Sequence, residues 1–130
     1  MNLKKRILEV LDRLIYRFLE NSFEIMPLRF TKLLAFYYTD ARIRKLYWRK
    51  LGLFLGENSY ANLGVKVVRN YGDYKVTVGK NVSIAPNVVF ICESTANNGW
   101  EINTLPYVRD NITAAGDIIV EDEVWIGANT

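Results

Sequence analysis

The chain of 130 residues contains no histidine and a single cysteine, Cys92. Without histidine it lacks the imidazole side chain that is best suited to act as a general base near neutral pH. One cysteine excludes an internal disulfide and fits a reducing compartment. The longest apolar run, Leu33 to Tyr38, is far too short to span a bilayer. Charged residues interrupt the segment after the basic start, so no signal peptide is indicated and a cytoplasmic location is expected.

Charge is distributed unevenly along the chain. Residues 1–50 hold twelve Lys and Arg against five acidic residues, whereas residues 51–130 hold five basic and nine acidic residues. A basic half can contact nucleic acid, an anionic membrane or a phosphorylated cofactor, although a solvated helical face is the simplest interpretation. No nucleic-acid-binding motif accompanies the charge, so nucleic acid is not an expected partner.

The first fifty residues predict a helical, basic N-terminal arm. The apolar residues of 3–19 form one helical stripe: Ile7, Leu8, Leu11, Leu14, Ile15, Phe18 and Leu19. Asn21 and Ser22 are a stop signal, and Pro27 begins a second helical stretch over 28–50 that is aromatic and basic. Packing of this arm on the rest of the chain or on a neighbouring subunit is the favoured interpretation. Peripheral contact with a membrane surface is the alternative.

From Gly52 and Gly56 onward, helical periodicity ends and units of six residues begin. Val78 and Ile84 start two tandem units, Val120 and Ile126 start two more, and an earlier copy starts at Leu55. Each unit has an aliphatic first residue and Ser, Thr or Val in fifth place. A short fixed period of this kind predicts a parallel β-helix, whose coils stack around one continuous core.

Asparagine recurs at the fourth position of these units, at Asn58, Asn81, Asn87 and Asn129. Corners between the strands of a coil need residues that tolerate a positive φ, and asparagine does so best after glycine. The alternative is an antiparallel sheet with Asn-rich turns. That fold would show alternation of period two and no recurrence at six.

Two interruptions break the six-residue units. The first, residues 69–74, is short and rich in turn residues. The second, residues 93–116, is long, polar and aromatic. Because a long loop is uncommon in a compact fold without a function, the second interruption is a candidate location for a site.

The segments 56–62, 76–88 and 124–128 resemble the hexapeptide-repeat acyltransferases, and most closely the galactoside, maltose and polysaccharide O-acetyltransferases. The resemblance covers about residues 52–130. It implies a partial left-handed parallel β-helix over residues 51–130. The expected fold is therefore mainly β, with the helical arm of residues 1–50, which the resemblance does not cover, preceding the β-helix. The resemblance also implies a homotrimer with sites between subunits, and acetyl transfer from acetyl-CoA to a saccharide hydroxyl without a metal.

The resemblance also assigns site residues. Asn62 matches an acceptor-binding asparagine, Trp125 matches a tryptophan that lines the active site, and Ala128 lies where the family's backbone meets the pantetheine arm of acetyl-CoA. Two alternatives remain open, since Asn62 could be an ordinary coil corner and Trp125 could serve packing alone.

The sequence departs from the family in two respects. The position of the family's catalytic histidine falls at about Thr95, which cannot act as a base near neutral pH. The weak substitute is Glu93, if desolvation raises its pKa, and Cys92 could be a nucleophile only if its pKa were lowered. Family members also continue for several more coils, so a truncated acyltransferase is expected. The predicted function is therefore an acetyl-CoA-dependent O-acetyltransferase, and the alternative is an inactive, truncated β-helix module for assembly or saccharide binding.

Overall fold

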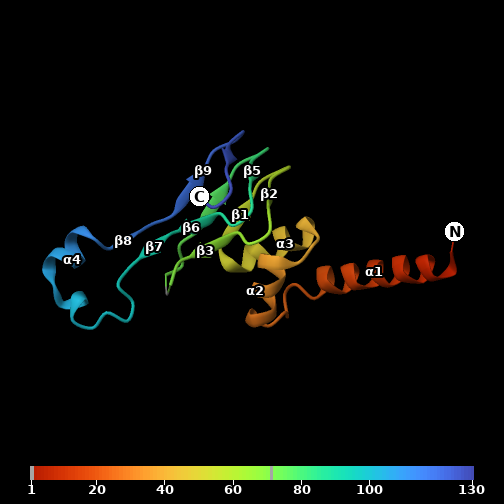
Figure 1. The fold of residues 1–130 in the computed structure, drawn as a ribbon, viewed down its shortest axis with the longest axis horizontal. Coiled ribbons are helices and arrows are strands. Elements are labelled where there is room, and N and C mark those ends of the chain that lie inside the picture. Colours follow the sequence, from red (N-terminus) through yellow and green to blue (C-terminus); the bar gives the residue numbers. More distant parts are fainter. Residues whose placement is uncertain (1, 71) are drawn as a thin grey trace.

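A computed structural model describes residues 2–70 and 72–130 as helices followed by short strands (Figure 1). Tyr71, in the first interruption, lies outside this range. The helices are α1 (Leu3–Asn21), α2 (Leu28–Tyr37), α3 (Ala41–Trp48) and α4 (Pro106–Asn111), with 3₁₀ turns η1 (Arg49–Leu51) and η2 (Ile102–Thr104). The strands are β1 (Leu53–Leu55), β2 (Tyr60–Ala61), β3 (Lys66–Val68), β4 (Val76–Val78), β5 (Ser83–Ile84), β6 (Val89–Ile91), β7 (Glu93–Ser94), β8 (Ala114–Ala115), β9 (Ile118–Val120) and β10 (Trp125–Ile126).

Eight of the strands pair in parallel and repeat in register. The sheets are β1-β4-β9, β2-β5-β10 and β3-β6, and the antiparallel pair β7-β8 stands apart from them. Leu53 pairs with Val76 and Tyr60 with Ser83, a step of 23 residues from the first turn of the chain to the second. The next step is 42 residues, because residues 93–116 are inserted before β9. Successive turns of the chain therefore stack strand on strand, while the left-handed β-helix stays a prediction.

The predicted corners are confirmed by their backbone angles. Asn58, Asn81, Asn87 and Asn129 all have positive φ, between 54° and 61°. The side chains of the first corner also form a ladder from one turn of the chain to the next. Asn58 Nδ2 donates to Asn81 Oδ1 at 3.0 Å, and Asn81 Nδ2 donates to Glu123 Oε1 at 2.6 Å. The first corner thus fixes both the bend of the chain and the register of the neighbouring turn.

The core extends from the space between the stacked strands to α3, whose Ile43, Tyr47 and Trp48 are fully buried. Val78 and Ile84, the first residues of two tandem units, are buried, as predicted for the inward-facing position. Ser59 is buried as well, and its hydroxyl donates to the Gly79 carbonyl at 2.7 Å and accepts from the Val82 N–H at 2.9 Å. In the third turn of the chain, Val120 and Ile126 are only half-buried.

Helix α3 packs against β1 and β2 and covers the first turn of the strands. Its cations bind backbone carbonyls there. Arg44 is buried, and its guanidinium donates to the Ala61 carbonyl through Nε at 3.1 Å and Nη2 at 3.0 Å. Lys45 Nζ donates to the Gly56 carbonyl at 2.6 Å. Part of the arm's positive charge is therefore structural, because it satisfies oxygens at an otherwise open strand edge.

The helix boundaries mostly follow the sequence signals. Helix α1 ends at Asn21 with Ser22 as its cap, and Pro27 caps α2, as predicted. The single stretch predicted over 28–50 is wrong in one respect, because Tyr38 is extended and Asp40 caps a new helix. The Asp40 carboxylate accepts from the Arg42 N–H at 2.9 Å, which supplies one of the bonds that a helix N-terminus lacks.

Helix α1 projects from the body of the molecule (Figure 1). The arm packs on the strands through α3, whereas only Leu19 of the α1 stripe is buried, and packing of α1 on a neighbouring subunit stays a prediction. Within residues 2–70 and 72–130, no helix combines the length and the apolar character needed to cross a membrane.

Candidate functional site

A depression beside β2 and β5 contains Asn62. It is lined by Tyr60, Asn62 and Ser83, with the buried Arg44 beneath it. The Asn62 N–H donates to the Ile84 carbonyl at 3.2 Å, and its own Oδ1 accepts from the Leu63 N–H at 2.7 Å. These bonds fix Asn62 at the corner and leave its amide NH₂ group without a partner in the described part of the chain. Asn62 can therefore form the corner of the coil and still offer its side-chain NH₂ group to an acceptor.

Trp125 lies on the same sheet as this depression. It pairs with Ser83, which pairs in turn with Tyr60, so the three side chains share one face of β2-β5-β10. The indole of Trp125 is 83% exposed, so it packs against little in its own chain. The arrangement gives an aromatic residue on either side of a serine hydroxyl.

Ala128 follows β10 and is exposed. Its neighbour Asn129 donates its N–H to the Pro86 carbonyl at 3.1 Å, which holds this turn against the corner after β5. The structure therefore gathers Asn62, Trp125 and Ala128 along one sheet and the corner that follows it.

The residues near the family's histidine position lie at a different corner. Glu93 follows β6, and its Oε2 accepts from the Gly72 N–H at 3.3 Å. The Thr95 hydroxyl donates to Asn97 Oδ1 at 2.7 Å. The β3-β6 sheet separates this corner from Asn62, because Asn62 precedes β3 and Glu93 comes after β6. A single chain does not bring them together.

The Cys92 thiol is not activated as a nucleophile. It is buried, and burial raises the pKa of its thiol; the nearby Asp117 raises it further, while Arg69 opposes the shift. A raised pKa keeps the side chain as the neutral thiol near neutral pH, whereas nucleophilic attack needs the thiolate.

The long insertion contains a second depression. The sequence predicted a site within residues 93–116 but did not indicate which residues form it. Residues 93–116 project away from the stacked strands on the side opposite α1 (Figure 1). The depression is lined by Asn97, Asn98, Trp100, Asn103 and Thr104, and Trp100 is 88% exposed. The side-chain amides of Asn98 and Asn103 make no hydrogen bond within the described residues, although the Asn103 backbone N–H donates to the Gly99 carbonyl. An exposed indole beside free amides can stack on and hydrogen-bond a polar ligand.

Other members of the two depressions could not be found from the sequence. Arg44 and Tyr60 reach the first depression through tertiary packing and the 23-residue register. Across residues 2–70 and 72–130, no three His, Cys, Asp or Glu side chains are grouped so that they could hold a metal ion.

Comparison with known proteins gives a similarity to an enzyme that transfers acetyl groups. That relative is the galactoside O-acetyltransferase of Escherichia coli (strain K12), which is 32% identical over 85 residues, or 60% of this chain. The chain spans 40% of the length of that relative. No family model matches the chain, and neither does any solved structure.

Proposed function

We propose that this chain belongs to an acetyl-CoA-dependent O-acetyltransferase that acts on a sugar or polysaccharide hydroxyl. The observation that supports it most is the 32% identity to a galactoside O-acetyltransferase. The proposal includes a left-handed β-helix, built from the parallel strand stacks, and a homotrimer with sites between subunits.

In this proposal the acceptor sugar occupies the depression beside β2 and β5. The Asn62 amide hydrogen-bonds a sugar hydroxyl, and the Tyr60 and Trp125 rings contact apolar faces of the sugar. Ala128 contacts the pantetheine arm of acetyl-CoA. The sugar oxygen then attacks the thioester carbonyl, the C–S bond breaks, and the proton of the hydroxyl passes to a base. Backbone amides stabilise the oxyanion that forms.

The described residues that line the depression beside β2 and β5 include no Asp, Glu or His, so the base comes from elsewhere. Glu93 is the carboxylate nearest the expected position, but it lies at the other corner of the strand stack. It could reach an acceptor bound near Asn62 only across a subunit boundary. The proposed homotrimer would provide such a boundary.

A thiol-release assay tests the proposal on the full chain. With acetyl-CoA and a panel of sugars, CoA release should depend on the sugar and on the protein concentration. Asn62→Ala and Trp125→Ala should lower the rate by about tenfold or more, because each removes a contact to the acceptor. Ile119→Gln, an exposed change on β9, should leave the rate unchanged. Background release by folded protein with every sugar would contradict the proposal.

A second function is favoured by the depression in the insertion. Trp100 and its neighbouring amides could bind saccharide without chemistry, in a β-helix module that is catalytically inactive. The absence of histidine and the neutral thiol of Cys92 agree with this alternative. Saccharide titrations followed by tryptophan fluorescence test it. Trp100→Ala should abolish the response, whereas Tyr107→Ala, an exposed aromatic change in α4, should preserve it.

A further inference from the structure

The apolar face of α1 is exposed along most of the helix. Leu8 is 64% exposed, Leu14 59% and Phe18 64%, although all three belong to the stripe predicted from the sequence. An apolar face of this extent is unusual on a free protein surface and indicates a site that something else covers.

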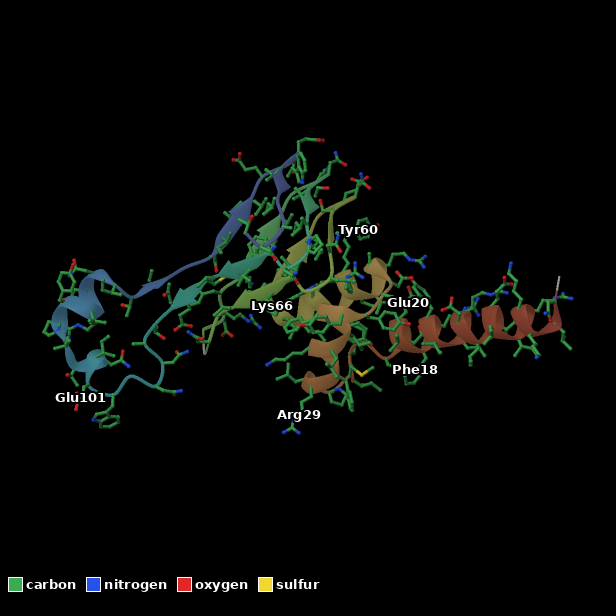
Figure 2. The ribbon with its side chains drawn as sticks, viewed as in Figure 1. Phe18, Glu20, Arg29, Tyr60, Lys66 and Glu101 are labelled. Atoms are coloured by element: carbon green, nitrogen blue, oxygen red, sulfur yellow. The ribbon has the colours of Figure 1, made fainter. Side chains whose placement is uncertain are left out.

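Helix α2 also exposes apolar side chains. Its residues Leu28, Phe30, Leu33 and Tyr37 are each more than half exposed, at 60%, 57%, 59% and 54%. Figure 2 shows Phe18 of α1 and Arg29 of α2 extending toward the same side of the molecule, while Glu20 extends toward the opposite side. We call the apolar stripe of α1 together with the exposed residues of α2 the arm surface.

Five cations of α1 and α2 have no partner within the described residues, unlike the cations elsewhere in the chain. Arg42 pairs with Asp40, Lys80 with Glu57 and Arg109 with Asp110. Lys50, at the end of the arm, donates to the Phe23 carbonyl at 2.8 Å. Within the described residues, the Lys and Arg side chains that make no ion pair, hydrogen bond or cation–π contact all belong to α1 or α2: Lys4, Arg6, Arg17, Arg29 and Lys32.

We propose that the arm surface binds an anionic lipid membrane, with α1 lying in the plane of the headgroups. The apolar side chains would enter the boundary between headgroups and acyl chains. The unpaired cations would contact the negative lipid headgroups, which supply the charge that this chain does not. A helix with one apolar face, one charged face and an excess of Lys and Arg has the composition that such a position requires.

Charge complementarity favours a lipid surface over a second copy of the chain. Two α1 helices packed through their apolar faces would bring the same unpaired cations, such as Arg6 and Arg17, toward each other. The acids that could balance them are Glu9, Asp12 and Glu20. Glu9 already lies 4.0 Å from Lys5, and Glu20 is on the side away from Phe18 (Figure 2). An anionic membrane matches both the apolar and the basic parts of the surface.

Vesicle flotation of the full chain tests this proposal. Vesicles of phosphatidylcholine alone are compared with vesicles containing about one-third phosphatidylglycerol, at low and high salt. The protein should float with the anionic vesicles and should be released as salt increases. Leu14→Gln should weaken binding by about tenfold because it removes an inserted side chain. Arg17→Gln should weaken it by about fivefold.

The controls are matched changes outside the arm surface. Ile119→Gln and Arg109→Gln should float like the unchanged protein, and circular dichroism should show that all four variants are folded. Equal binding to neutral and anionic vesicles, or no flotation, would overturn the proposal. So would loss of a sedimenting oligomer in Leu14→Gln without any vesicle binding, because it would assign the surface to a second copy. None of these results depends on acetyl transfer.

Discussion

Glu123 holds a left-handed backbone, with φ of 59°, at a corner where the preceding turns of the chain place asparagine. A glutamate in this region is strained, because its Cβ crowds the backbone and it lacks the local bonds that favour asparagine there. Its Oε1 nevertheless accepts a hydrogen bond from Asn81 Nδ2 at 2.6 Å, which continues the ladder of side chains at this corner. At the scale of single residues, Glu123 thus combines a strained backbone with a hydrogen bond that links two successive turns of the chain.

Replacing this glutamate should stabilise the protein. Glu123→Asn relieves the backbone strain and keeps a side-chain acceptor for Asn81, so the free energy of unfolding should rise by about 1 kcal/mol. Urea unfolding measures the change. Glu121→Asn is the matched control, since Glu121 lies in the same turn without a positive φ, and it should change stability little. A lower stability for Glu123→Asn would show that the carboxylate contact outweighs the strain.

Asp40 makes stability depend on pH. The hydrogen bond from the Arg42 side chain is the main cause that lowers the pKa of the Asp40 carboxyl, with burial opposing it. Because the folded pKa lies below the unfolded one, this stabilisation is present above about pH 4 and is lost as pH falls through the folded pKa. Asp40→Ala should cost about 1 kcal/mol at pH 7 through loss of the helix cap. Asp40→Asn should retain most of the cap and show a shallower loss of stability below pH 4 in thermal melts.

At the scale of elements, α3 closes the first turn of the strands with side-chain donors. Arg44 donates to the carbonyls of Ala61, Tyr38 and Thr39, and so joins the strand edge to the segment that separates α2 from α3. Burial lowers the pKa of this guanidinium, but it remains charged at any ordinary pH. The helices and strands are thus connected through one buried cation.

Removing that cation should destabilise the chain strongly. Arg44→Met keeps the length of the side chain but leaves the buried Ala61 carbonyl and the part-buried Tyr38 carbonyl without donors, at a cost of about 3 kcal/mol in the free energy of unfolding. Denaturant unfolding measures it. Arg17→Met, on the exposed side of α1, should have an effect below about 0.5 kcal/mol. Equal effects of the two changes would contradict a structural role for Arg44.

The sequence predicted those elements whose signals are local. The corner asparagines could be predicted because a positive φ restricts the choice of residue at each position. The break at Asp40 was missed within a continuous aromatic and basic stretch. The bonds of Arg44 and Lys45 could not be predicted, because Ala61 and Gly56 meet α3 only after the chain folds back. For the same reason, the sequence assigned Asn62 and Trp125 by resemblance but not the Tyr60 and Ser83 that accompany them.

At the scale of the whole molecule, three surfaces project in different directions. The strand sheet holds the Asn62 depression, the insertion presents Trp100, and α1 extends on the opposite side (Figure 1). Tyr60, which lines the Asn62 depression, lies on the side of the molecule away from Phe18 and Arg29 (Figure 2), so the depression remains accessible to a saccharide if the arm surface lies on a membrane. The proposed acetyl transfer and the proposed docking are thus compatible in one molecule.

Transfer of a labelled acetyl group tests the central claim most directly. The chain of 130 residues is incubated with radiolabelled acetyl-CoA and galactosides or polysaccharide fragments, and the label is followed into the sugar. We predict labelled sugar in proportion to protein, reduced by Asn62→Ala and unchanged by Ile119→Gln. Folded protein that binds saccharide but transfers no label to any sugar would contradict the claim and leave the saccharide-binding module as the function of this chain.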